Sequence, residues 1–74
     1  MDKKALLSAL EEILSIAHGT LKSDSLLSAF ADWDSMAFLG VVSLMDLQFH
    51  KKISLETINS FKTPQDIFNF IGMT

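Results

Sequence analysis

Hydrophobic residues recur at intervals of three or four along the first segment, and this spacing predicts an amphipathic α-helix. Asp2 precedes the segment and is a good N-cap, because its carboxylate can accept hydrogen bonds from first-turn amides. Gly19 predicts the C-terminal stop, one position past His18. The predicted buried stripe consists of Leu6, Leu10, Ile13, Leu14 and Ala17, and the residues predicted to face outward are Ser8, Glu11, Glu12 and Ser15.

Residues 19–33 show no clear periodicity. A loop of this length in a compact domain needs side chains that attach it to the core. Leu26, Leu27 and Phe30 are the apolar residues available for this. We therefore expect them to pin the loop, with a short turn of helix around residues 25–30.

The longest helical pattern runs from Ser35 to about His50, and Asp34 before it is a good N-cap. Ser35 is then the first helical residue, with its hydroxyl facing solvent at the positive end of the helix dipole. At 100° per residue, the predicted buried arc consists of Phe38, Val41, Val42, Met45 and Phe49. The opposite arc, called the outward arc below, consists of Met36, Leu39, Gly40, Ser43, Asp46, Leu47 and His50. Three large apolar residues beside one carboxylate are unusual for a solvent-facing arc, so we expect this surface to dock onto another molecule.

Two further helices are predicted after this one. Ser54 can cap a short third helix that carries Leu55, Ile58 and Phe61. The run 63–66, Thr-Pro-Gln-Asp, is a strong helix start, with a capping threonine, proline at the first helical position and a carboxylate in the first turn. The fourth helix carries Ile67, Phe68, Phe70 and Ile71, and Gly72 ends it. No strand-like alternation of useful length occurs, so the chain is predicted to be an all-α, small four-helix bundle.

Composition narrows the class of protein. The 74 residues allow a single domain, 1–74. The chain has no cysteine, which fits a reducing cytoplasm, and neither a signal-peptide pattern nor an unbroken apolar run that would span a membrane. The net charge of −3 argues against nucleic acid as a partner. We expect a cytoplasmic monomer, and the ends at Met1 and Thr74 favour a standalone protein.

The triplet Asp34-Ser35-Met36 resembles the Asp-Ser-Leu motif of acyl carrier proteins, whose serine receives a 4′-phosphopantetheine arm. The resemblance covers nearly the whole chain: the first amphipathic helix, the long loop, the motif at the start of the longest helix, a short third helix and a last helix that starts at Thr63. It implies a bundle of the acyl-carrier-protein type, with a long first loop and a short third helix.

The resemblance also implies a function without catalysis in the chain itself. A phosphopantetheinyl transferase would move the arm from coenzyme A onto Ser35, with Asp34 and Met36 as motif residues. The arm would carry an acyl group as a thioester to acyl-activating, acyltransferase or condensing enzymes. The residues expected to contact these partners are Met36, Leu39, Gly40, Ser43, Asp46 and Leu47.

Three departures from the family pattern bear on the pathway. Asp32-Trp33 stands where the family often has a small pair such as Gly-Ala, and Met36 replaces the leucine after the serine. The second helix has only Asp46 on its outward arc, where carriers of fatty acid synthesis usually bear several glutamates. These features favour a dedicated carrier for one specialised pathway, recognised by apolar contacts as much as by charge. Trp33 is most simply a packing residue over the helix start.

Alternatives remain open at this point. The cargo could be aminoacyl or peptidyl rather than acyl, although the aspartate before Ser35 favours acyl. A small helical interaction module without a prosthetic group would use the same outward arc, unless the loop or the third helix covers its apolar residues. A serine-dependent enzyme is remote, because His50 lies about 22 Å from Ser35 along the helix and His18 is placed near a helix end, where it suits the dipole. No group of residues has the spacing of metal ligands.

Overall fold

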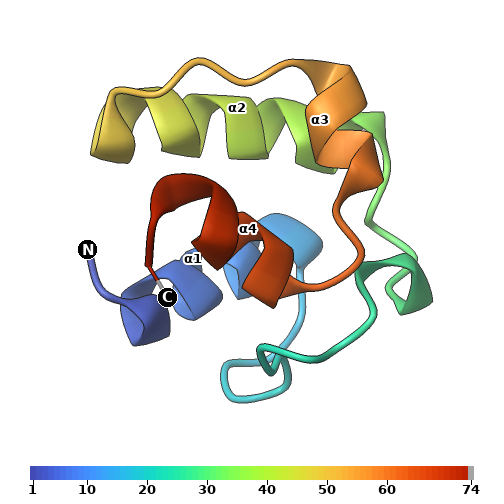
Figure 1. Cartoon of the computed structure of the whole chain (residues 1–74). Helices are drawn as coiled ribbons and strands as arrows, with labels where there is room; N and C mark the ends of the chain where they lie inside the picture. Colours follow the sequence, from blue (N-terminus) through green and yellow to red (C-terminus); the bar gives the residue numbers. More distant parts are fainter. Residues whose placement is uncertain (74) are drawn as a thin grey trace.

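Four α-helices and one short 3₁₀ turn make up the computed structural model, which describes residues 1–73 (Figure 1). No strand occurs in this part of the chain. The radius of gyration is 10.9 Å, close to the roughly 11 Å expected for a compact domain of this length. The predicted all-α class with four helices is therefore confirmed. In chain order the elements are α1 (Lys3–Leu14), η1 (Leu27–Ala29), α2 (Ser35–Phe49), α3 (Leu55–Ser60) and α4 (Pro64–Ile71).

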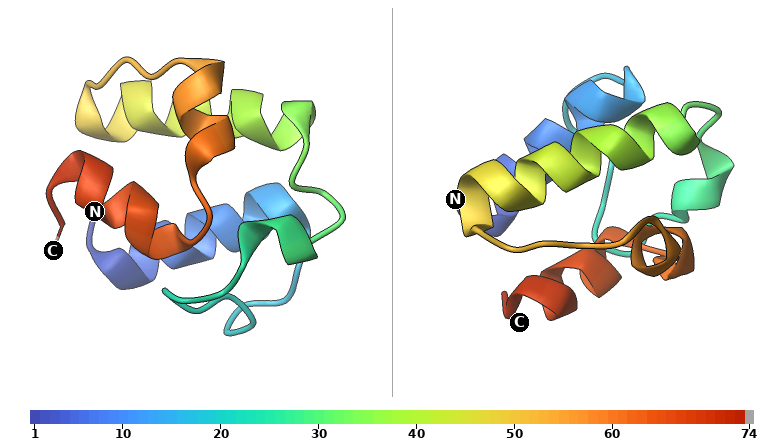
Figure 2. Two further views of the ribbon diagram at one scale, coloured as in Figure 1. Left: turned by 45° about the vertical axis from the view of Figure 1, so that its right-hand side comes forward. Right: turned by 90° about the horizontal axis from the view of Figure 1, so that it is seen from above.

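The two longest helices, α1 and α2, pack directly against each other, and α4 lies beside this pair (Figures 1 and 2). The short helix α3 packs against α2 and crosses it at a steep angle. The long segment between α1 and α2 closes one end of the bundle (Figure 2). The start of α2 therefore lies at the end of the molecule that this segment covers.

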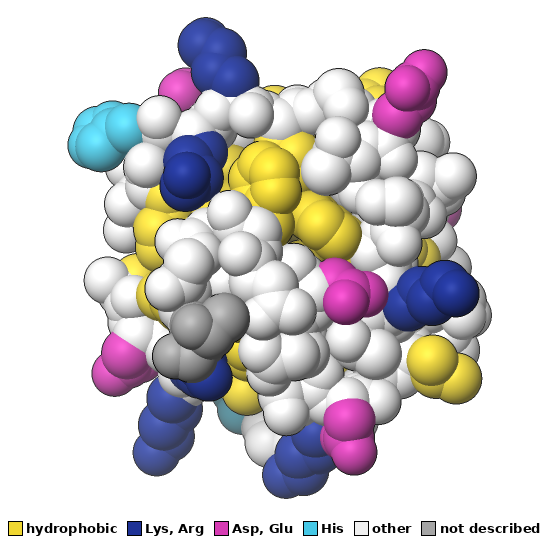
Figure 3. Space-filling view, in the orientation of Figure 1, with side chains coloured by type: hydrophobic (Ala, Val, Ile, Leu, Met, Phe, Trp, Pro, Cys, Tyr) yellow, Lys and Arg dark blue, Asp and Glu magenta, His cyan; other side chains and the backbone are white. Residues whose placement is uncertain are grey.

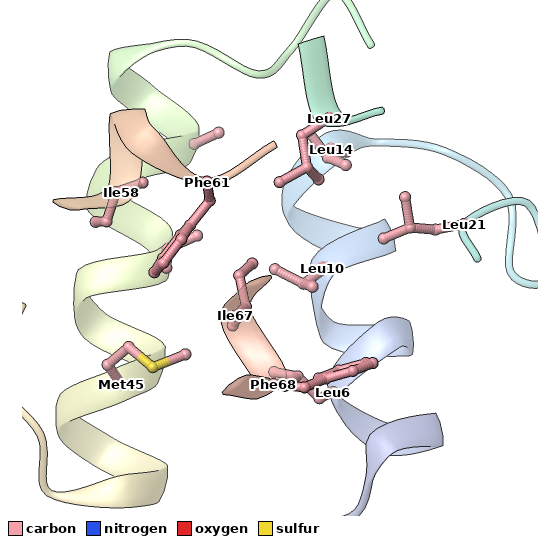
Figure 4. Close-up of a cluster of buried hydrophobic side chains, with 12 residues drawn as sticks. Leu6, Leu10, Leu14, Leu21, Leu27, Met45, Ile58, Phe61, Ile67 and Phe68 are labelled. Atoms are coloured by element: carbon pink, nitrogen blue, oxygen red, sulfur yellow. The ribbon is translucent and has the colours of Figure 1, made fainter. Parts of the chain in front are cut away.

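The core is built from one stripe of each helix. In α1, Leu6, Leu10 and Leu14 are buried at four-residue spacing, as predicted. Ile67 and Phe68 of α4 lie between α1 and α2 (Figure 4). The predicted buried arc of α2 is also confirmed, since its five residues are buried or packed against the core; Ala37 is a further buried residue that the prediction missed. The remaining buried apolar side chains are those of Leu21, Leu27, Val41, Met45, Ile58, Phe61 and Pro64.

The predicted end of the first helix is wrong. Helix α1 ends at Leu14, and Ser15 follows in the left-handed conformation, with φ 56°. Ala17, predicted in the buried stripe, is exposed beyond the helix end, and Gly19 lies in the loop with φ +91°. The physical reason is that the chain turns back immediately after Leu14 to reach the side chain of Glu11.

Glu11, predicted to face outward, is buried, with 2% of its surface exposed. Its Oε2 accepts hydrogen bonds from the backbone N–H groups of Gly19 (2.8 Å) and Leu21 (2.9 Å). Its Oε1 lies 3.3 Å from Nδ1 of His18. A carboxylate is stable inside the protein only when such donors replace water. Glu11 therefore anchors the loop that follows α1.

The same contacts determine how this site responds to acid. The hydrogen bond from Leu21 lowers the pKa of Glu11 most strongly; burial raises it, and Gly19 and His18 lower it further, so that the pKa lies below its ordinary value of 4.5 overall. A carboxyl with a lowered folded-state pKa stabilises the fold above its unfolded pKa, and this contribution disappears as pH falls through the folded value.

We therefore expect the free energy of unfolding to fall as pH decreases below about 4.5, and to fall less steeply in Glu11→Gln, which has no charge to lose. Urea unfolding measures this when it is repeated at several pH values between about 3 and 7, a range that covers the titration of a carboxyl group. Parallel pH profiles for the two proteins would contradict the assignment.

The loop between α1 and α2 is pinned, but not by all the predicted side chains. The 3₁₀ turn Leu27–Ala29 lies within the predicted 25–30, with Leu27 fully buried and Phe30 packed against the core. Leu26 is 58% exposed and does not anchor the loop. Backbone hydrogen bonds attach the loop to the start of α4 and to the segment before it: Leu27 N–H donates to Lys62 O (2.9 Å), and Gln65 N–H of α4 donates to Ser23 O (3.0 Å).

The signals for the last two helices are confirmed. The Ser54 side chain accepts from Thr57 N–H at the start of α3. Pro64 occupies the first turn of α4, and the Asp66 carboxylate accepts from the N–H groups before it. Gly72 ends α4 with φ 83°, a conformation that favours glycine. Leu55 is half exposed, so Ile58 and Phe61 hold α3 to the core.

Gly40 marks the place where α1 and α2 approach each other closely. A Cβ atom added there would lie 3.3 Å from Cγ1 of Ile13. Gly40, which the sequence placed on the outward arc, is half-buried against α1 for this reason.

Gly40→Leu is expected to destabilise the protein by about 1–3 kcal/mol, because the added atoms must push α1 away from α2. Ser43→Leu, at an exposed position one turn further along the helix, is the matched control and should stay within about 0.5 kcal/mol. Urea unfolding followed by circular dichroism measures both. Equal stabilities for the two variants would show that the close approach has no energetic importance.

Candidate functional site

The start of α2 is built by Asp34. Its backbone is extended, and its Oδ1 accepts hydrogen bonds from the N–H groups of Met36 (3.1 Å) and Ala37 (3.3 Å). Phe38 N–H donates to Asp34 O at 2.9 Å and begins the helical pattern. The prediction that Asp34 is the N-cap and Ser35 the first helical residue is confirmed.

Trp33 holds the turn before α2 in place. Its ring meets that of Phe38 edge to face, with centroids 4.9 Å apart and planes at 70°. The backbone N–H of Trp33 donates to Phe30 O at 3.1 Å, which connects the turn to the pinned loop. The predicted packing role of Trp33 over the helix start is confirmed, and the position of Ser35 is fixed from both sides.

Ser35 is exposed at the end of the molecule that the loop closes. None of the hydrogen bonds found among residues 1–73 uses its hydroxyl. An anionic group attached at the N-terminus of a helix is favoured by the dipole, by about 0.3–1 kcal/mol at an exposed site. The hydroxyl is therefore accessible for modification, and its position favours an anionic substituent.

The apolar members of the outward arc are exposed to solvent. Met36 is 75% exposed, Leu39 55% and Leu47 73%, so neither the loop nor α3 covers them. Ser43 and Asp46 are exposed on the same arc, and only Gly40 is withdrawn beneath Ile13. The predicted outward orientation of this arc is therefore confirmed, except that Gly40 is a packing residue at its edge.

Charges near this surface are separated along α2. Asp32 and Asp34 are exposed at its start, Asp46 is exposed near its end, and Lys51 and Lys52 follow its last turn. Figure 3 shows a similar distribution of charge over one face of the whole molecule, where acidic and basic side chains are scattered rather than gathered in a block of one charge. A partner that binds along the outward arc of α2 would contact apolar side chains over most of the length of the helix.

A hollow of about 450 Å³ lies beside Ser35, between the end of α1 and the start of α2. It includes four residues that the sequence did not assign to the site: Ala37 of α2, and Ile13, Ser15 and Asp32. The last three were missed because they come from α1, its end and the turn before α2, and only the packing of α1 on α2 brings them to Ser35. Gly40 was the available signal, since a glycine inside a helix often marks a close approach. The full lining is Ile13, Ser15, Asp32, Asp34, Met36, Ala37 and Gly40.

Both histidines lie away from the hollow beside Ser35. His50 ends α2 as its C-cap, with φ 53°, at the end opposite Ser35 and about 22 Å away along the axis. His18 lies in the loop beside Glu11, not at a helix terminus as expected. Neither lines the hollow beside Ser35. Ser35 therefore has no histidine base within reach.

Removal of the cap tests the local construction of the site. Asp34→Ala is expected to destabilise the protein by about 0.5–2 kcal/mol, because two first-turn N–H groups lose their acceptor. Asp32→Ala removes an exposed carboxylate of the same turn that makes no capping bond and serves as the matched control. Thermal unfolding measures both; an equal loss in the two variants would contradict the capping role.

Residues 1–73 contain no candidate for a membrane-spanning helix or a metal site. None of the helices described has the length and apolar character needed to cross a membrane. Within the same residues, no three His, Asp or Glu side chains come together as a metal site would require.

Comparison with known proteins found no relative: no family model matches the chain, no curated protein matches it, and no solved structure matches it. Any assignment of function therefore rests on the residues of the site and on the resemblance in the sequence.

Proposed function

We propose that this chain is an acyl carrier protein, which bears a 4′-phosphopantetheine arm on Ser35 and presents an acyl group as a thioester to partner enzymes. The observation that carries the proposal is the position of Ser35: an exposed serine at the first position of the longest helix, held there by the Asp34 cap. The pinned loop before it and the short α3 after it support a bundle of the acyl-carrier-protein type.

Loading needs a nucleophile from this chain, and the transferase supplies the bound coenzyme A and the base. The Ser35 oxygen attacks the β-phosphorus of coenzyme A, a new P–O bond forms, and the bond to adenosine 3′,5′-bisphosphate breaks. The serine proton goes to a base of the phosphopantetheinyl transferase, since the chain offers no histidine near Ser35. The chain is then a carrier rather than an enzyme, and its thioester is formed and consumed by acyl-activating, acyltransferase or condensing enzymes.

Partner enzymes would dock on the outward arc. Met36, Leu39 and Leu47 supply exposed apolar area, and Ser43 and Asp46 supply polar contacts between them. The tethered cargo reaches a docked enzyme at high effective concentration, so the docking itself needs only modest affinity. With one carboxylate on this arc, recognition depends on apolar contact more than on charge, which suits a dedicated pathway. Acyl cargo is favoured by Asp34, with an aminoacyl or peptidyl carrier as the alternative.

Intact-protein mass spectrometry after incubation with coenzyme A and a broad-specificity phosphopantetheinyl transferase tests the proposal. We expect the mass to increase by one phosphopantetheine, and digestion should place it on the peptide that contains Ser35. An unchanged mass would overturn the proposal, provided that circular dichroism shows a folded protein and a control carrier is modified in the same reaction.

A second function is favoured by the exposed apolar residues themselves. A small interaction module without a prosthetic group would also need Met36, Leu39 and Leu47 at the surface. Loading of the wild-type protein distinguishes the two, since Leu39→Ser and Leu47→Ser are expected to weaken partner binding in both cases. An interaction module loses its partner and is never loaded, whereas a carrier is loaded by the transferase and then requires the arm on Ser35 to complete its reaction with a partner.

A further inference from the structure

The four methionines carry all the sulfur of the chain, since it contains no cysteine. Their exposure to solvent differs widely. Met36 is 75% exposed and Met1 48%, whereas Met45 is fully buried, and Figure 4 shows the sulfur of Met45 on the core side of α2. Met73 packs against the core. The most exposed methionine of the chain is therefore the one that follows Ser35.

An exposed methionine can be oxidised to its sulfoxide, and a reductase can reverse the change. With hydrogen peroxide, the sulfur lone pair attacks one oxygen, an S–O bond forms and the O–O bond breaks. The hydroxide that leaves takes the proton of the transferred oxygen, so the products are methionine sulfoxide and water. The sulfur loses two electrons and the peroxide gains them. Exposure favours this reaction at Met36, and burial protects Met45.

The thioether of Met36 lies where an enzyme must cover it. Ser35 and Met36 are adjacent and both exposed, so an enzyme that reaches the Ser35 hydroxyl also contacts Met36. Leu39, three residues further along, is a neighbour of Met36 on the helix surface. A flexible, apolar thioether adapts well to an apolar partner surface. A sulfoxide at the same position is polar, and docking would remove its oxygen from water without supplying a donor.

The surroundings of Met36 do not compensate for this cost. Met36 lines the hollow beside Ser35 together with Asp32 and Asp34, whose carboxylates are acceptors only. No lysine, arginine or histidine lines this hollow, so the sulfoxide oxygen finds no cationic donor there. In the free protein the oxygen would remain in water, because the Met36 side chain is exposed. Oxidation should therefore weaken docking and leave the fold unchanged.

We infer that Met36 is a site of reversible oxidation, and that its sulfoxide opposes docking on the outward arc, so that peroxide suppresses the loading of Ser35; this inference rests on the proposed function. Leucine, the residue of the family motif at this position, has no sulfur to oxidise. The replacement by Met36 thus gives this chain a sensitivity to oxidation at the place where its partners dock.

Oxidation of the unloaded protein, followed by the loading reaction, tests the inference. Peroxide is removed before coenzyme A is added, because the thiol of coenzyme A also reacts with it. Peptide mapping should show Met36 oxidised well before Met45, and the midpoint of urea unfolding should not change. We expect kcat/KM of loading to fall at least about tenfold, which corresponds to about 1.4 kcal/mol. Reduction of both sulfoxide epimers by methionine sulfoxide reductases should restore it.

Met36→Leu is the matched control, because it keeps an apolar side chain and still contains the exposed Met1. It should be loaded at the same rate before and after peroxide. Unchanged loading of the oxidised wild-type protein would overturn the inference. An equal loss in Met36→Leu would also overturn it, since the effect would then arise at another residue. Wild-type protein that is not loaded even before oxidation would instead overturn the proposed function, and this inference with it.

Discussion

Replacement of Ser35 by alanine is expected to abolish loading by the transferase completely while leaving the fold intact. The hydroxyl is exposed and takes part in none of the hydrogen bonds found in residues 1–73, so its loss should change the free energy of unfolding by no more than about 0.5 kcal/mol. The alanine side chain, by contrast, has no oxygen to which the arm could be attached. Intact mass after the loading reaction and urea unfolding measure the two effects on the same preparation.

Ser28→Ala is the matched control, because Ser28 is also exposed and lies outside the outward arc. It should be loaded as well as the wild type. Full loading of Ser35→Ala would move the attachment to another residue and contradict the proposed site. A loss of loading together with a loss of the helical circular dichroism signal would indicate unfolding. It would contradict the prediction that Ser35→Ala leaves the Asp34 cap and the fold intact.

Replacement of Glu11 by alanine is expected to have the largest effect on stability, about 2–4 kcal/mol. The backbone N–H of Leu21 is buried and loses its acceptor, as does that of the partly buried Gly19, and an unsatisfied buried donor costs about 1–3 kcal/mol. A domain of this size has a total of roughly 4–11 kcal/mol. The variant should therefore lose a large fraction of its stability, and the loop after α1 should detach.

Glu12→Ala is a close control, since Glu12 is the next residue, has the same chemistry and is exposed. Its effect should stay within about 0.5 kcal/mol. Urea unfolding can be followed by the fluorescence of Trp33, the only tryptophan of the chain. Amide hydrogen exchange at Leu21 adds a local readout and should accelerate strongly in Glu11→Ala. Equal stability of the two variants would show that Glu11 does not anchor the loop.

The helix starts were predicted well because each depends on neighbouring residues. Asp2, Asp34 and Ser54 cap their helices with side chains that reach N–H groups two or three positions away. The end of α4 at Gly72 is equally local, since a glycine there adopts φ 83° without strain. The candidate site shares this property: the exposure of Ser35 at a capped helix start follows from Asp34-Ser35 and from the helical pattern after it.

The periodicity of apolar residues also identified which faces of the helices turn inward. It placed Leu6, Leu10 and Leu14 in the core, and it placed Met36, Leu39 and Leu47 on the exposed arc of α2. Whether those three were covered by other parts of the chain was left open, because exposure depends on where the loop and α3 lie. Their exposure followed only from the assembled fold.

What the sequence determined by itself was therefore the number of helices, their starts, the faces they bury and the position of Ser35. The tertiary structure alone decided the burial of Glu11, the end of α1 at Leu14, the packing of Gly40 on Ile13 and the hollow beside Ser35. The physical reason is the separation of the interacting residues along the sequence: a cap or a helical stripe involves residues within a few positions of each other. A buried carboxylate is stable only where donors from a loop eight to ten residues away replace its water, and a hollow exists only where two helices meet.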